Sequence, residues 1–81
     1  MAAVRLGLQE ARMLLDAQAD ERKAEQVRFR EVTNRYNQQS VLLSDLLQQE
    51  ATTSQAEAQY QQALADLWTA RAEFEKAIGM E

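Results

Sequence analysis

The chain of 81 residues contains no cysteine, no histidine and no proline, and its formal net charge is −4. Such a length allows one small domain with a thin core, which often needs a partner or an oligomer. The absence of cysteine excludes disulfides and thiol chemistry, the absence of histidine removes the commonest general base and metal ligand, and the negative charge argues against nucleic acid as a partner.

The first predicted element is a helix over residues 3–36, because apolar residues recur there at helical spacing. One face carries Val4, Leu8, Ala11, Leu15, Phe29, Val32 and Tyr36. Gln18, Arg22 and Glu25 interrupt this face in the middle. A second apolar set lies on nearly the opposite side and consists of Leu6, Met13, Ala17, Ala24 and Val27. At about 1.5 Å per residue the helix would be roughly 50 Å long.

A turn is predicted at residues 37–40, where Asn37, Gln38, Gln39 and Ser40 interrupt the apolar rhythm without adding charge. Asparagine tolerates the left-handed conformation that often follows a helix C-terminus. Serine is a preferred N-cap, so Ser40 could open a new helix at residue 41, and the Ser44-Asp45 pair offers a second capping site one turn later. The turn has neither glycine nor proline, so a single continuous helical rod is the alternative.

The second predicted helix covers residues 41–78, and Gly79 suits its C-terminal stop. Its main apolar face contains Thr53 and six larger residues that we expect to pack against a neighbouring helix, namely Leu46, Tyr60, Leu64, Leu67, Phe74 and Ile78. Two rows of alanine run beside and opposite this face at strict heptad spacing. They are Ala56, Ala63, Ala70 and Ala77, and Ala51, Ala58, Ala65 and Ala72. A heptad repeat of this length predicts a left-handed coiled coil.

Each predicted helix therefore carries apolar residues on two opposite sides. A free two-helix hairpin needs only one apolar face per helix, so the second face suggests a further neighbour in an oligomer or larger bundle. Alanine is also the best helix former, and the row from Ala51 to Ala72 could simply fill an exposed surface. Charge is divided unevenly, with a net charge of +1 in residues 1–37 and −5 in residues 38–81. This difference favours pairing of unlike helices.

The sequence predicts no catalytic residue, no cofactor, no metal site and no enzyme activity. No lysine is near Ser40, Ser44 or Ser54 in sequence, and there is no glycine-rich phosphate loop. The carboxylate pairs Asp20/Glu21 and Glu73/Glu75 do not share a helix face. The chain has no run of about 18 apolar residues, the length that a helix needs to span a bilayer, and no signal peptide is visible. We therefore expect that this segment does not insert into a membrane and that the isolated fragment is soluble.

The order and spacing of several motifs resemble the periplasmic helical hairpins of TolC-type outer-membrane efflux proteins. The Arg35-Tyr36 pair, the short polar tip and the Asp45-Leu46-Leu47 triplet follow the pattern of that family. The alanine-rich segments 58–67 and 70–79 are similar to its second helix, and residues 4–17 are similar to the start of the preceding helix. The family usually has glycine in the tip, where this chain has Gln39.

The resemblance implies an all-α fold, with two long antiparallel helices in a coiled-coil hairpin that packs with further helices in an oligomer. It implies that residues 1–81 are one hairpin of a larger channel of Gram-negative bacteria, with a periplasmic location. In the family, such hairpins form a threefold tunnel that exports small molecules, and their tips face a periplasmic adaptor protein and an inner-membrane pump. Carried onto this chain, the docking tip would consist of Asn37, Gln38, Gln39, Ser40 and Val41.

A stand-alone coiled-coil domain for dimerisation or protein interaction is the alternative function. An enzyme or an RNA-binding hairpin fits the composition poorly, because the chain lacks histidine and is acidic. Trp68 and Tyr60 could act as stacking platforms for bases, but their helical spacing beside leucines favours a role in packing.

Overall fold

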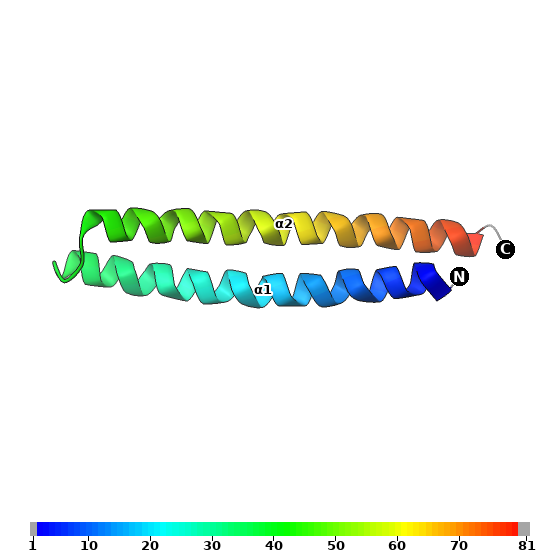
Figure 1. The fold of residues 1–81 in the computed structure, drawn as a ribbon, viewed down its shortest axis with the longest axis horizontal. Coiled ribbons are helices and arrows are strands. Elements are labelled where there is room, and N and C mark those ends of the chain that lie inside the picture. Colours follow the sequence, from blue (N-terminus) through cyan, green and yellow to red (C-terminus); the bar gives the residue numbers. More distant parts are fainter. Residues whose placement is uncertain (1, 80–81) are drawn as a thin grey trace.

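The computed structural model describes residues 2–79 and contains two long antiparallel helices, α1 (Ala2–Asn37) and α2 (Leu43–Gly79). They lie side by side along their whole length and are joined by one short turn (Figure 1). The Cα atoms extend over 63 × 13 × 13 Å. The predicted all-α hairpin is confirmed, and the alternative of one continuous rod is wrong for this chain. Packing of the hairpin with further helices stays a prediction.

The two helices meet along a narrow seam whose most buried residues are Glu25, Ala56 and Ala63, with 3%, 4% and 3% of their surfaces exposed. The Thr53 hydroxyl donates to the Glu25 backbone carbonyl at 3.3 Å, which places these residues opposite each other. In this antiparallel register Leu15 stands opposite Ala63. The small alanine side chain allows a close approach of the two backbones there.

The first helix ends in a Schellman motif, a pair of backbone hydrogen bonds around a left-handed residue. The Ser40 amide donates to the Arg35 carbonyl at 2.8 Å, and the Gln39 amide donates to the Tyr36 carbonyl at 2.9 Å. The left-handed residue is Gln39, with φ of 62°, and not Asn37, which is the last residue of α1. The position that carries glycine in the resembled family is therefore the one that needs a positive φ here.

The expected N-cap role of Ser40 is wrong, because its hydroxyl faces the other helix end. It donates to the Arg35 carbonyl at 2.9 Å and so satisfies the C-terminus of α1. The second helix begins at Leu43, two residues later than predicted. At this end the Leu42 amide donates to the Asp45 carboxylate at 3.1 Å, as in one half of a capping box. The predicted N-cap at the Ser44-Asp45 pair is wrong too, because both residues lie inside α2, and Asp45 acts from the first turn of the helix by accepting from the Leu42 amide.

Neither helix in the described residues combines the length and the hydropathy that crossing a bilayer requires.

Candidate interaction surfaces

The outward side of α1 carries large apolar residues in contact with water. Leu6 is 55% exposed, Met13 is 70% exposed and Val27 is 50% exposed. Ala17 on the same side is exposed, whereas Ala24 is half-buried. We call these five residues the α1 outer stripe. Asp20 is the polar member of the heptad row that holds Leu6, Met13 and Val27. Large apolar side chains at this exposure, gathered on one side of a helix, are typical of an interaction surface.

The outward side of α2 carries the second alanine row, Ala51, Ala58, Ala65 and Ala72, and all four residues are exposed. We call this row the α2 outer stripe. The inner row differs, because Ala56 and Ala63 are buried and Ala70 and Ala77 are half-buried. The hairpin therefore uses one of the two alanine rows for its own seam and leaves the other in water.

Trp68 lies beside the α2 outer stripe and is 60% exposed. The Arg71 guanidinium carbon stands 5.7 Å from the centre of its ring, and Arg71 Nε pairs with a Glu75 carboxylate oxygen at 3.2 Å. With Ala72, these three side chains line an open hollow of about 390 Å³. A tryptophan next to a charged pair and small residues has the composition of an interface hot spot.

The predicted tip residues lie at the closed end of the hairpin. Residues 37–40 are exposed and Val41 is half-buried. Two shallow hollows, of about 470 and 220 Å³, share Gln39, Val41 and Leu42. The structure therefore brings part of the predicted set together around one concave surface.

Sequence reasoning missed the apolar component of the tip. Leu42 is 71% exposed, Leu43 is 52% exposed and Leu47 is 54% exposed. The signal was present in the run from Val41 to Leu47, where only some leucines can face α1. A second helix that begins at residue 43 turns the others toward solvent.

The six residues predicted to pack between helices differ in their exposure. Leu46, Tyr60, Leu64, Leu67 and Phe74 are half-buried. Ile78, near the open end of the hairpin, is 46% exposed.

Polar side chains gather on the seam at mid-length, where the apolar face of α1 is interrupted. The Gln49 side-chain amide donates to one Glu25 carboxylate oxygen at 2.7 Å, and Arg28 donates to the other. Arg22 forms an ion pair with Glu57 and lies over the Tyr60 ring, 4.6 Å from its centre. In this part of the seam the two helices are therefore held together by hydrogen bonds and charge.

Gln18 belongs to the same polar segment, and its Oε1 atom is buried. Among the described residues it has no hydrogen-bond donor within reach. A buried polar atom that lacks a partner reduces stability.

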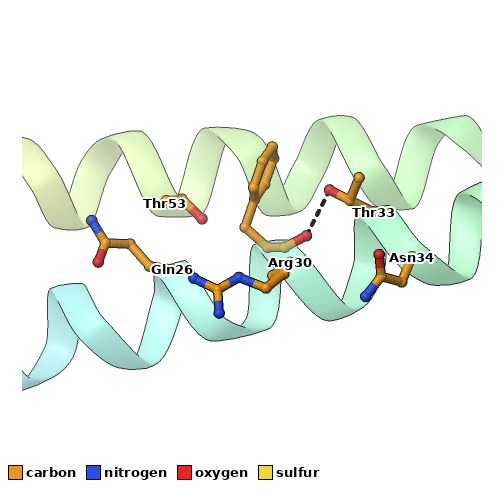
Figure 2. A pocket seen from close by; sticks show the side chains of 6 residues that line it. Gln26, Arg30, Thr33, Asn34 and Thr53 are labelled. Atoms are coloured by element: carbon orange, nitrogen blue, oxygen red, sulfur yellow. Dashed lines mark hydrogen bonds between the residues drawn. The ribbon is translucent and has the colours of Figure 1, made fainter.

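An open groove of about 480 Å³ lies on the flank between the helices. Figure 2 shows its labelled side chains, with Gln26, Arg30, Thr33 and Asn34 on α1 and Thr53 on α2. The Thr33 hydroxyl donates to the Phe29 carbonyl of its own helix at 2.7 Å. Gln26, Arg30 and Asn34 follow one another at a spacing of four residues and form a polar flank on α1.

Within residues 2–79 no three acidic side chains come together in an arrangement that could hold a metal ion.

Searches of protein-family models, curated proteins and solved structures give no match to this chain.

Proposed function

We propose that this chain is a wall segment of the periplasmic tunnel of a TolC-type outer-membrane efflux channel. In that role the hairpin by itself does not bind the exported molecule. It packs between neighbouring helices around a threefold axis and presents its closed end to an adaptor protein and an inner-membrane pump. The proposal rests on the sequence resemblance and on the surfaces that the isolated hairpin leaves uncovered.

The observation that carries the proposal is the outward exposure of apolar residues on both helices. A two-helix hairpin in water needs one apolar face per helix, and the seam uses it. The outer stripes remain, with Met13 70% exposed on α1 and Trp68 60% exposed beside the alanine row of α2. A helical tunnel supplies each helix with a neighbour on both sides, which would cover these residues.

Docking at the tip is supported by the shape and composition of the closed end. Four of the five predicted tip residues, all but Gln38, line the two hollows, and Leu42 and Leu43 add exposed apolar area to their walls. Apolar side chains within a polar rim are the usual anatomy of a protein-binding surface.

A chimaeric channel tests the proposal. This segment replaces the periplasmic hairpin of a TolC-type channel, and trimer formation is measured by native electrophoresis and export by the drug resistance of channel-deficient cells. We expect trimers and restored export. Ala65→Glu places a charge on the α2 outer stripe and should abolish both, because a buried carboxylate without a partner is strongly destabilising.

The matched control is Gln59→Glu, which adds the same charge at an exposed position outside the α2 outer stripe. It should leave trimers and export intact. A parent chimaera that folds but does not form trimers would contradict the proposal. If the Ala65→Glu chimaera assembles and exports like the parent, the stand-alone coiled-coil domain becomes the better assignment.

A further inference from the structure

The inner alanine row cannot by itself fix how the two helices are aligned. Leu15 stands opposite Ala63 in the observed register and Leu8 stands opposite Ala70. A displacement of α2 by one heptad would place alanine from the same row opposite both leucines again. The alanine repeat therefore permits several alignments at these two leucines.

Hydrogen bonds cap both helix ends at the turn, but the backbone conformation of the turn does not itself favour the observed register. The turn contains no glycine, and its left-handed residue is Gln39, which has a side chain that disfavours this conformation. A one-heptad displacement would move the turn by only three or four residues. In one direction it would reach Leu42 and Leu43, beside the Ser44-Asp45 pair.

Two polar groups on the seam distinguish the registers. Arg22, which pairs with Glu57 and lies over Tyr60, is partly exposed, whereas the cluster around Glu25 is the more deeply buried of the two. Glu25 is 3% exposed, and its carboxylate accepts a hydrogen bond from Gln49 at 2.7 Å across the seam. The Thr53 hydroxyl donates its proton to the Gln49 carbonyl of its own helix at 2.8 Å and shares it with the Glu25 backbone carbonyl across the seam at 3.3 Å. Arg28, on the same helix, binds the other carboxylate oxygen in any register.

Displacement by one heptad removes the partners that α2 supplies. In one direction Ala56 and Tyr60 would replace Gln49 and Thr53, so the amide donor would be lost and a bulky ring would stand in place of threonine. In the other direction, Leu42 and Leu46 would take these places, and neither has a polar side chain. In both displaced registers the buried Glu25 carboxylate keeps Arg28 but loses the Gln49 hydrogen bond to its second oxygen, which is costly, whereas the alanine row accepts either displacement.

We infer that Glu25, Gln49 and Thr53 act as a register lock, a polar cluster that restricts the hairpin to one alignment and so places the turn at Gln39. The lock works by penalising the displaced alignments. A single buried polar residue has the same role in coiled coils whose apolar repeat leaves register open. The inference concerns the hairpin alone and does not depend on the proposed channel.

Spin labels test the lock, because the chain has no cysteine of its own. Gln9→Cys and Gln55→Cys place labels on exposed positions of α1 and α2. Pulsed electron paramagnetic resonance should give one distance between the two spin labels in the parent chain. The apolar variant Glu25→Leu/Gln49→Leu/Thr53→Val should give at least two distances about 10 Å apart, the axial length of seven helical residues. One unchanged distance in this variant would overturn the inference.

The matched control makes the same three changes at exposed neighbouring positions, Glu21→Leu, Gln48→Leu and Thr52→Val. It should keep the single parental distance. If the control also shows two distances, the second register is caused by added hydrophobicity and not by loss of the cluster, and the inference fails.

A second variant moves the lock without changing the composition. Gln49→Ala, Ala56→Gln, Thr53→Tyr and Tyr60→Thr together exchange two residues of α2 with their counterparts one heptad later. Glu25 then finds its partners only in the displaced register, so the main label distance should lengthen by about 10 Å. A folded chain that keeps the parental distance would show that other contacts set the register.

Discussion

The two alanine rows of α2 have the same residue, the same heptad spacing and nearly the same length, yet they occupy opposite environments. Ala56 and Ala63 lie in the seam with 4% and 3% of their surfaces exposed. Ala58 and Ala65, only two residues further along the chain, are exposed. Two positions along a helix correspond to a rotation of about 200°, which separates the packed side from the free side.

Small residues in a heptad repeat therefore mark a place for close helix approach but do not determine which helix approaches. The inner row faces α1, whose larger leucines lie opposite the small alanines. The outer row has the same capacity for close packing, and within the described hairpin nothing covers it. Substitutions in only one row therefore distinguish residues that stabilise the hairpin itself from residues that would be buried only in a larger assembly.

The largest expected effect is that of Ala63→Glu on the isolated chain. The new carboxylate would be forced between the helices without a partner, which should reduce the free energy of unfolding by about 3 kcal/mol or more. Circular dichroism during urea titration measures this loss. Because a hairpin of this size has a small core, most of the helical signal should disappear even without urea.

Ala65→Glu is the control on the outer row. In the isolated chain it should lower the free energy of unfolding by only about 0.5 kcal/mol, the combined size of a helix-propensity difference and an ordinary surface change. Equal losses at positions 63 and 65 would mean that both rows are buried in solution, which is the signature of self-association. Sedimentation at several concentrations would then detect the oligomer.

A stabilising change is expected within the seam at Gln18, whose Oε1 atom is buried without a donor among the described residues. Gln18→Leu removes this atom and adds apolar contact, so the free energy of unfolding should rise by about 1 kcal/mol. Gln48→Leu is the control at an exposed position and should have little effect. A loss of stability in Gln18→Leu would show that the glutamine has a partner in solution.

The fold followed from the sequence because its main signals are periodic. The apolar rhythm predicted both helices, and the break after Tyr36 located the turn to within two residues. The environment of the two alanine rows was harder to predict. Both rows have the same local pattern, and only the alignment with α1 decides which one is buried.

The polar middle of the seam was visible only as an interruption. Gln18, Arg22 and Glu25 break the apolar face of α1, but no local rule links Glu25 to Gln49, which lies 24 residues away. Capping chemistry was similarly ambiguous. The hydroxyl of Ser40 can serve either helix end, and the choice depends on which backbone group is left without a partner.

At the tip, Gln39→Gly should raise the free energy of unfolding by up to about 1 kcal/mol. A left-handed φ of 62° is unfavourable for a residue with a Cβ atom, and glycine removes this cost while adding some freedom to the unfolded chain. Gln38→Gly is the neighbouring control and should be neutral or destabilising. Among the described non-glycine residues the positive φ is at Gln39, so glycine at position 38 relieves no such cost. Urea titrations of both variants give the difference.

If glycine also favours the closed turn over an extended rod, Gln39→Gly should not lengthen the molecule in solution scattering. The parent should already have a maximum dimension close to that of the hairpin, whose Cα atoms extend over 63 Å. A much longer parent that shortens on this substitution would mean that the turn is open in part of the population.

The smallest effect is expected beside the outer stripe, at the ion pair of Arg71 and Glu75. Both side chains are more than half exposed, at 57% and 65%. Glu75→Gln should therefore lower the free energy of unfolding by only about 0.3 kcal/mol, and 1 M salt should abolish the difference. The contrast with Glu25 follows from burial, since its carboxylate is almost fully removed from water and is bound by two donors. A loss above about 1 kcal/mol that persists in high salt would mean that the Trp68 side of α2 is covered in solution, and that the outer surface already has a partner.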